Sequence, residues 1–430
     1  MQEQNKSRKE GGKVLTALIL ALVVVLSFAL GYFSNYIFSS REQKVTSEIV
    51  NLLNGVGYIV DPVTGERKDI TEEDIADALV NAFLDRYSAY YTAEEYKVVT
   101  AEEKGNRVGV GVSFHYNTPL LTKVIGNSPA DHAGMKRGDY LVSGSENGGE
   151  KVTFTTSSSV IEFLSNCADD SIITLTVLRD GKTLDFSLKE ASYVTSYVNY
   201  YDDGARLTFR SEKEGGKLSK KVDQADKMKG LDQKTAYISF DLFEGGATEQ
   251  MEEALSFMES RGKSKLILDL RNNGGGYMTI LCDIAAMLVR NGNKGNFVVA
   301  YSESKSGFQE YKSGKYNYKE HLEKIVILAN ENTASAAECL IGALSVNDSV
   351  YSSGDIVIEK NSKGVAKTYG KGIMQTTYQL LSGGAFKLTT AKIYWPDKTT
   401  SIHGVGVIAD GENAVSSGNA LDRAIYLISK

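Results

Sequence analysis

The second half of the chain alternates short apolar runs with longer segments that have helical periodicity. From Lys234 onward, AYISF precedes TEQMEEALSFM, LILDL precedes YMTILCDIAAMLV, and KIVILA precedes the segment that follows Ser335. Repeated strand–loop–helix units predict a largely parallel sheet with helices packed on it. Reactive groups in such folds lie in the loops beyond the carboxyl ends of the strands, and NNGGG and NENTAS follow strands in that way.

The length and composition narrow the class of protein. The chain has 430 residues and a formal net charge of −6. This length gives room for two or three domains with their own cores, and the mild acidity gives no reason to expect a nucleic-acid partner. The three cysteines, Cys167, Cys282 and Cys339, are far apart and lie in mostly apolar stretches. They therefore predict neither a disulfide framework nor a zinc site.

The N-terminal region contains an uncharged run at residues 14–40, which includes VLTALILALVVVLSFALGYF. This run is long enough to span a bilayer, and the basic residues before it predict a cytoplasmic N-terminus. A cleaved signal peptide is the alternative, but the run is longer than a usual signal core and no clean small-x-small site ends it. We expect a single-pass anchor in the cell membrane, with the catalytic region on the extracytoplasmic side.

The patterning predicts a mixed, α+β chain with several parts. Acidic residues after Ile70 and Thr71 indicate a helix start, and KGIMQTTYQLL and FKLTTAKIYW indicate two late strands. In order, the expected parts are a basic cytoplasmic tail at 1–13, the transmembrane anchor at 14–38, a helical region at 39–104, a domain of short strands and glycine turns at 105–192, a charged, solvated linker or inserted hairpin at 193–232, and the β/α core at 233–430.

Ser335 lies where KIVILA turns into a helix, and the residues alone leave two roles open for it. In a structural role its hydroxyl caps the helix, because Ser335 and Glu338 have the three-residue spacing of a capping box. In a catalytic role it is a nucleophile, which needs a base and an oxyanion hole. Thr333 is the other hydroxyl of the turn.

The base for such a nucleophile is more readily found among the lysines than the histidines. None of the four histidines lies in a convincing motif, and only His321 and His403 fall in the second half. Lys371, in KTYGKGIMQ, has glycine on both sides, which lets the backbone approach another element closely. Burial would lower the pKa of such a lysine and make it a base, and Gln375 could orient the amine. The alternative is a surface lysine in a glycine turn.

The NNGGG loop predicts an oxyanion hole. Successive glycines let backbone N–H groups face an oxyanion without obstruction by side chains, and the N–H of Ala336 at the helix start is a second donor. A phosphate-binding glycine loop is the alternative. The chain has neither the GK[ST] sequence nor the GxGxxG pattern with an acidic partner that such loops carry.

Residues 84–410 resemble the carboxyl-terminal processing peptidases, also called tail-specific proteases. The motifs that carry this resemblance follow one another in the family's order: LDRYSAYYTAEEY, GVGVSF, SPADHAGMKRGDYLV, LILDLRNNGGG, NENTASAAE, TYGKGIMQ and LTTAKIYWPDKTTSIHGVGV. The resemblance implies a Ser-Lys serine endopeptidase that needs no metal or cofactor. It makes Ser335 the nucleophile, Lys371 the base, and Gln375 the residue that orients Lys371. Gly275 and Ala336 then supply the oxyanion-hole N–H groups.

The same resemblance implies a PDZ domain at 105–192, and this domain indicates the class of substrate. Its carboxylate-binding loop is Gly109, Val110, Gly111 and Val112, and Val112 and Phe114 line a pocket for an apolar last residue. PDZ domains bind free C-termini by such loops, so we expect protein or peptide substrates with free, apolar C-termini. Other expected partners are the membrane and a second copy of the chain or an activating protein, but no nucleic acid.

Three departures from the family occur where it often has proline, at Arg86, Arg137 and Gly274. Proline cannot donate a hydrogen bond, so the donor role is carried to Gly275, and the choice between Gly274 and Gly275 stays open. Thr333 occupies the place of a second small hydroxyl and is expected to support the turn. The alternative function is a membrane-anchored PDZ scaffold with an inactive peptidase-like domain.

Overall fold

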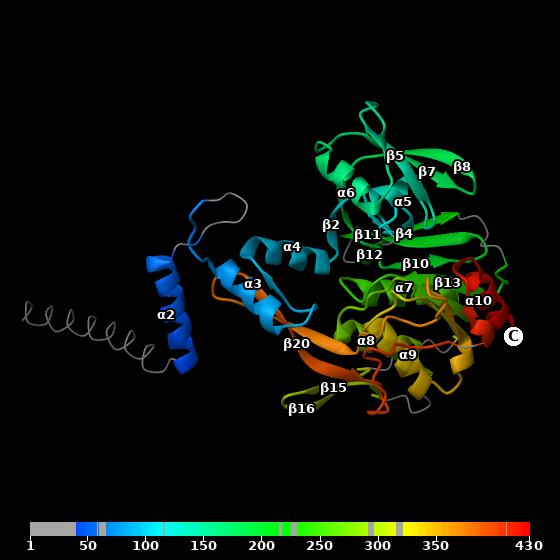
Figure 1. Cartoon of the computed structure of the whole chain (residues 1–430). Coiled ribbons are helices and arrows are strands. Elements are labelled where there is room, and N and C mark those ends of the chain that lie inside the picture. Colours follow the sequence, from blue (N-terminus) through cyan, green and yellow to red (C-terminus); the bar gives the residue numbers. More distant parts are fainter. Residues whose placement is uncertain are drawn as a thin grey trace, which may run out of the picture. The chain divides into compact units, whose positions relative to one another are not determined.

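The computed structural model of the chain describes residues 40–57, 59, 66–114, 117–214, 217–224, 230–290, 296–314, 321–409 and 411–430 (Figure 1). The chain divides into two compact units, Met1–Phe83 and Leu84–Lys430. The anchor expected at residues 14–38 lies outside the described residues. Within the described ranges, no helix has both the length and the apolar character needed to cross a bilayer.

The described residues of the first unit include helices α2 (Arg41–Val56) and α3 (Glu72–Phe83). Helix α2 begins at a capping box formed by Ser40 and Gln43. The helix start predicted after Ile70 is confirmed. The N–H of Asp74 donates to the Thr71 hydroxyl at 3.1 Å, and three acidic residues occupy the first turn of α3, where the helix dipole favours negative charge.

The second unit begins with a short strand and a helix and continues into a strand-rich domain. These elements are β1 (Ala89–Tyr91), α4 (Ala93–Glu103), β2 (Asn106–Gly109), β3 (Val112–Phe114), β4 (Leu121–Val124), α5 (Pro129–Ala133), β5 (Tyr140–Glu146), β6 (Val152–Thr153), α6 (Ser157–Asn166), β7 (Ile173–Arg179), β8 (Lys182–Leu188) and β9 (Ala191–Val194). Strands β6-β5-β7-β8 form one sheet, and β2-β9 and β3-β4 form two pairs. The domain has its own core, which includes Leu141, Val160 and Leu175.

An eight-stranded sheet forms the centre of the remaining chain, in the order β12-β11-β10-β13-β14-β17-β18-β21. The strands are β10 (Val198–Tyr201), β11 (Ala205–Glu214), β12 (Lys217–Gln224), β13 (Thr235–Phe240), β14 (Lys265–Asp269), β17 (Lys324–Ala329), β18 (Ile356–Glu359) and β21 (Ala414–Val415). Strands β13, β14, β17, β18 and β21 pair in parallel, so the predicted parallel sheet is confirmed.

Of the two possibilities expected for segment 193–232, the structure has the inserted hairpin, formed by β11 and β12, and not the solvated linker. Strands β10, β11 and β12 pair antiparallel with one another and extend the central sheet beyond β13. The reason is an apolar alternation within ARLTFR, because Leu207 and Phe209 are fully buried in the main core. Lysine and glutamate dominate the composition of the segment, but these apolar positions determine where it packs.

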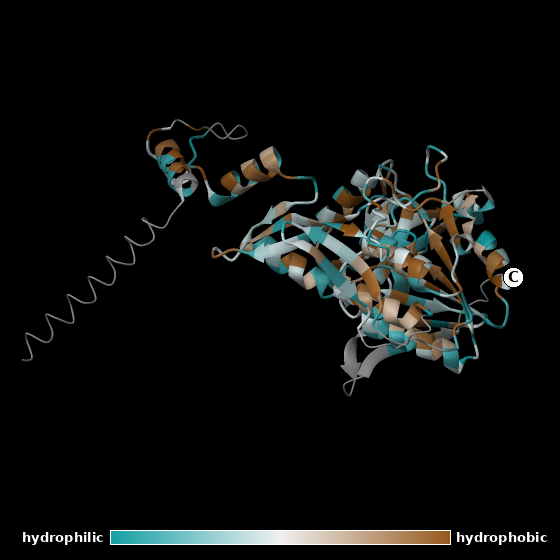
Figure 2. Ribbon diagram, turned by 90° about the horizontal axis from the view of Figure 1, so that it is seen from below, coloured by the Kyte–Doolittle hydropathy of each residue, from teal (hydrophilic) through white to brown (hydrophobic). Residues whose placement is uncertain are grey.

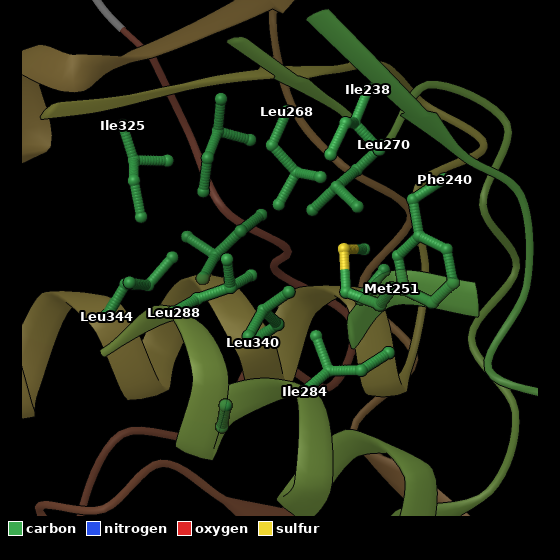
Figure 3. Close-up of a cluster of buried hydrophobic side chains, with 14 of the residues drawn as sticks. Ile238, Phe240, Met251, Leu268, Leu270, Ile284, Leu288, Ile325, Leu340 and Leu344 are labelled. Atoms are coloured by element: carbon green, nitrogen blue, oxygen red, sulfur yellow. The ribbon is translucent and has the colours of Figure 1, made fainter. Parts of the chain in front are cut away.

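Helices α7 (Ala247–Ser260), α8 (Met278–Leu288), α9 (Ala336–Asn347) and α10 (Ala420–Ser429) accompany the central sheet. Figure 3 shows side chains of β13, β14 and β17 facing those of α7, α8 and α9, with Ile238, Leu268 and Leu340 among them. Figure 2 shows hydrophobic residues along the strands of this unit and hydrophilic residues in many of its loops. Continuous apolar runs suit strands that helices cover.

A second sheet is antiparallel and includes the two late strands predicted from sequence. It contains β1, β15 (Val298–Ser304), β16 (Gly307–Lys312), β19 (Ile373–Gln379) and β20 (Ala385–Tyr394). Strand β1 pairs with β20, opposing Ala89 to Lys387. This pairing brings the LDRYSAY segment to the sheet that carries Gln375, far away in sequence.

Candidate active site

The NNGGG and NENTAS loops meet at the carboxyl ends of the neighbouring parallel strands β14 and β17, as predicted. Asparagine side chains hold them together. The Asn272 N–H donates to Asn330 Oδ1 at 3.0 Å, and Asn330 Nδ2 donates back to Asn272 Oδ1 at 2.9 Å. Asn272 Nδ2 also donates to the carbonyl of Thr122 in β4, so the first loop contacts the strand-rich domain directly.

Ser335 sits in a strained turn at the start of α9. Its backbone has φ 58° and ψ −119°, a region that L-residues rarely adopt. The neighbouring Gly275 has φ 98°, and a Cβ added to it would lie 2.7 Å from Ser335 Cβ and 2.8 Å from the Ala336 nitrogen. Only glycine fits there, and the close approach places the glycine loop against the serine.

The two N–H groups predicted to bind an oxyanion differ in their present hydrogen bonds. The Ala336 N–H has no acceptor among the described residues. The Gly275 N–H donates to Asn273 Oδ1 at 2.9 Å, and Asn273 is itself held by a bond from its Nδ2 to the carbonyl of Phe240. The Gly275 N–H would therefore have to leave Asn273 to bind an oxyanion.

Glu338 connects the turn at Ser335 to the loop at Lys371 by hydrogen bonds. Its fully buried carboxylate accepts hydrogen bonds from the backbone N–H of Ser335 at 2.8 Å, of Gly370 at 2.8 Å and of Lys371 at 3.0 Å. The hydroxyl of Thr368 donates to the same carboxylate. Burial raises the pKa of the Glu338 carboxyl, although these four donors oppose the shift. The capping spacing had indicated only the first of these contacts.

The glycines beside Lys371 have the role predicted for them. Gly370 has φ 87°, and a Cβ on it would lie 3.0 Å from the Gly406 nitrogen. A Cβ on Gly372 would lie 2.7 Å from the His403 nitrogen. The HGVG segment therefore crosses the lysine loop at a distance that excludes side chains on both glycines.

Lys371 is half-buried, and its pKa is lowered. Desolvation is the main cause, the nearby cation of Lys387 adds to it, and the carboxylate of Asp85 opposes it. The Nζ lies 5.0 Å from the centre of the Tyr87 ring. In the described part of the chain no group accepts a hydrogen bond from this Nζ, and none links it to the Ser335 hydroxyl.

An aromatic cluster fixes the ring that covers Lys371. Arg86 Nη2 donates to the hydroxyls of Tyr87 and Tyr369 at 2.8 Å each, and those two hydroxyls are 3.2 Å apart. Tyr369 is anchored in turn, because its N–H donates to the carbonyl of Thr333 at 2.9 Å. Arg86 stands where the family often has proline, and its guanidinium connects the segment of Tyr87 to the segment of Tyr369.

Gln375 lies on β19 and is directed toward β20. Its Nε2 donates to the Thr389 hydroxyl at 3.0 Å, and the described hydrogen bonds include none between Gln375 and Lys371. The β19–β20 register shifts between Met374 and Gln375. Such a bulge changes the direction of a side chain, so the orientation of Gln375 depends on a local irregularity that sequence does not reveal.

The other hydroxyl of the turn, Thr333, and the two histidines considered as bases, His321 and His403, make different contacts from Ser335 and Lys371. Thr333 is fully buried, donates to the carbonyl of Leu270 at 2.8 Å and accepts from the Asn330 N–H, so it supports the turn as predicted. His403 is exposed, and His321 Nδ1 lies 3.6 Å from a carboxylate oxygen of Glu259.

The expected carboxylate loop opens on a cavity of about 390 Å³ in the strand-rich domain. Val112 and Phe114 line it, as predicted, together with Ile125, Ile161 and Leu164. These five residues form an apolar part of the wall that suits an apolar side chain, and the charged Glu102, Arg107, Asp169 and Glu190 also line the cavity.

A buried ionic network joins the strand-rich domain to the central sheet. Arg137 pairs with Glu359 at 3.2 Å, and Arg271 pairs with the same carboxylate at 2.6 Å and with Asp269. Tyr237 donates its hydroxyl to Asp269. Sequence gave no signal for this network beyond the unusual arginine at 137.

Comparison with known sequences follows the same division of the chain. Residues 234–412 match peptidase family S41, and residues 107–189 match the PDZ domain family. A protein of Staphylococcus epidermidis named "Probable CtpA-like serine protease" is 25% identical over 403 residues, which cover 91% of this chain and 72% of that protein. A protein of the same name from Staphylococcus aureus is 26% identical over 406 residues, with 92% and 70% covered. The structure of the photosystem II D1 C-terminal processing protease has a TM-score of 0.48 at 19% identity, covering 91% of this chain and 98% of that one.

Proposed function

The chain belongs to the carboxyl-terminal processing peptidases, serine peptidases of family S41 with a PDZ domain, and on this premise we propose its mechanism and location. It is a membrane-anchored endopeptidase that recognises the C-terminal tails of proteins and cleaves them by a Ser-Lys mechanism. The observation that best supports the mechanism is the position of Glu338, whose carboxylate accepts hydrogen bonds from the backbone N–H groups of both Ser335 and Lys371.

In the proposed reaction, Ser335 Oγ attacks the carbonyl carbon of the scissile peptide bond while Lys371 Nζ takes the hydroxyl proton. The Ala336 N–H and a glycine N–H of residues 274–275 bind the oxyanion. Protonated Lys371 then donates its proton to the leaving amine. Water hydrolyses the acyl-enzyme in the second half of the cycle, with Lys371 again as base.

The lowered pKa of Lys371 supports this role, because a lysine with its ordinary pKa near 10.5 would be almost entirely protonated at neutral pH. The Tyr87 ring also favours the ammonium that forms during the reaction. Peptide binding would have to bring Ser335 Oγ and Lys371 Nζ into hydrogen-bond contact, since catalytic contacts often tighten only with substrate bound.

The substrate class rests on the cavity beside the GVGV loop. A free C-terminal carboxylate would bind the N–H groups of Gly109–Val112, and an apolar last residue would lie against Val112 and Phe114. The proposal of a membrane anchor is based on residues 14–38, whose length and basic flank favour a single membrane span.

An activity assay with the full chain and a fluorogenic peptide ending in a free apolar C-terminus tests the proposal. Ser335→Ala should fold and bind tails but lose turnover by on the order of 10^4-fold, whereas Thr333→Ala should lose far less. Equal losses in both variants would contradict the assignment of the nucleophile. Absence of cleavage with intact tail binding would favour the scaffold alternative.

A further inference from the structure

The LDRYSAY segment pairs with the sheet that carries Gln375, and its hydrogen bonds lead toward that residue. The Ser88 hydroxyl donates to Asp85 Oδ1 at 3.1 Å and accepts from the Thr389 N–H at 3.2 Å. The N–H groups of Tyr87 and Ser88 donate to the same carboxylate oxygen at 3.0 Å each. The segment is therefore attached to strand β20 at Thr389.

The side chain of Thr389 connects the Asp85 carboxylate to Gln375. Its hydroxyl hydrogen-bonds the carboxylate of Asp85, and Gln375 Nε2 donates to Thr389 Oγ1 at 3.0 Å. Thr389 and Gln375 lie directly opposite each other in the β19–β20 register, and both are half-buried. One hydroxyl group thus links the N-terminal segment of this unit to the residue expected to orient the base.

The direction of these hydrogen bonds is set by the charged end of the chain of contacts. Burial alone would raise the pKa of the Asp85 carboxyl, but the hydrogen bond from Thr389 and those within the local turn lower this pKa below its usual range. At neutral pH Asp85 is therefore a carboxylate, which can only accept. Since the single hydroxyl proton of Thr389 goes to Asp85, Thr389 Oγ1 can only accept from Gln375, and the amide must present its Nε2 to Thr389.

We propose that Thr389 is a positioning residue of the Ser-Lys reaction, because it holds the Gln375 amide with Oε1 as the atom left for Lys371. The inference rests on the proposed function, in which Gln375 orients Lys371. A lysine ammonium has three donors and no acceptor, so an amide turned the other way would present N–H groups to it. No described hydrogen bond occupies Gln375 Oε1, so this oxygen is free to accept when Lys371 becomes protonated.

Steady-state cleavage of the fluorogenic peptide by the full chain tests this role. Thr389→Val has nearly the same shape but no hydroxyl, and it should lower kcat about 10–100-fold while KM changes less than about 2-fold. Thr389→Ser keeps the hydroxyl and should keep kcat within about 3-fold of the native value. Thr390→Val is the matched control on the same strand, because it also removes a half-buried hydroxyl, one that lies 2.8 Å from the hydroxyl of Thr376, and kcat should stay within about 2-fold.

A double-mutant cycle separates positioning from a general effect on the fold. In the Gln375→Ala background, Thr389→Val should lower kcat no further, because the hydroxyl then has no amide to hold. A purely structural role would lower kcat by the same factor in both backgrounds.

The inference fails if Thr389→Val has the native kcat or a higher one, because Thr389 would then be dispensable or would hold Gln375 away from Lys371. It also fails if Thr389→Val and Thr390→Val lose activity equally, or if the effects of Thr389→Val and Gln375→Ala are additive. In these cases impaired Lys371→Ala and Gln375→Ala variants leave the proposed function standing. Native activity of Lys371→Ala or Gln375→Ala would contradict the proposed mechanism itself, and this inference with it.

Discussion

Glu338→Gln is the substitution that most sharply probes how the active site is held. The carboxylate accepts four hydrogen bonds, two on each oxygen: Thr368 and Gly370 donate to Oε1, and Ser335 and Lys371 donate to Oε2. The amide of glutamine has nearly the same shape but keeps only one acceptor oxygen. Whichever way it is turned, two donors then face an N–H₂ group in a fully buried site.

The expected loss follows from these contacts. Each buried donor left without an acceptor costs about 1–3 kcal/mol, so two cost about 2–6 kcal/mol of unfolding free energy. For a domain of this size that lowers Tm by roughly 5–20 °C. If the backbone of Ser335 or Lys371 also moves by about 1 Å, kcat should fall by about 100-fold or more.

The assay combines thermal unfolding with steady-state cleavage of the fluorogenic peptide, below the Tm of the variant. Glu331→Gln is the matched control, because Glu331 is exposed in the same turn and makes none of these contacts in the described structure. Tail binding in the PDZ cavity should be unchanged in both variants. Wild-type Tm and wild-type kcat in Glu338→Gln would refute the role of Glu338 in positioning Ser335 and Lys371.

Three further predictions concern the base, the tail and the glycine loop. Lys371→Ala should abolish cleavage, and so should Lys371→Arg, since a guanidinium does not release its proton in the pH range of the assay. His403→Ala should stay active. Cleavage by Lys371→Ala together with inactivity of folded His403→Ala would identify histidine as the base. The kcat/KM of the native chain should rise with pH through the pKa of Lys371, because only the neutral amine accepts a proton, and the lowered pKa moves this rise below pH 10.5. Amidating the substrate's C-terminus should weaken binding several-fold in a fluorescence-polarisation assay, and equal binding of amide and free acid would remove the PDZ cavity as the tail receptor. Gly275→Ala should lower kcat at least about 100-fold, because the added Cβ would lie 2.7 Å from the Cβ of Ser335. Gly274→Ala should lower kcat less, because its added Cβ would meet only a Leu242 carbon at 3.9 Å. Equal activities of the two variants would contradict the close packing at Gly275.

Local patterns predicted the parallel part of the fold well. Apolar runs such as LILDL and KIVILA appear as buried strands because helices cover them, and periodicity reports such burial directly. The close packing of the glycines around Lys371 was also predictable, because it follows from a short-range steric need. The supporting role of Thr333 was expected from the family resemblance.

Contacts between distant segments could not be predicted in this way. Arg86 binds the Tyr369 hydroxyl across 283 positions of sequence, and Glu338 binds backbone groups more than thirty residues away. A hairpin in 193–232 was one of the two expectations, but its addition to the central sheet was not predicted, since a few apolar residues outweigh many charged ones when a sheet edge is available. The direction of Gln375 depends on a bulge, which has no sequence signal here.

Covalent labelling of the intact chain with a serine-reactive fluorophosphonate, followed by mass spectrometry of the modified peptide, tests the central claim most directly. A Ser-Lys active site predicts modification of the peptide that contains Ser335 and not of Thr333, with labelling lost in Ser335→Ala and in Lys371→Ala and retained in His403→Ala. Labelling of a different residue, or labelling of Ser335 that is unaffected by Lys371→Ala, would contradict a Ser-Lys active site at this turn.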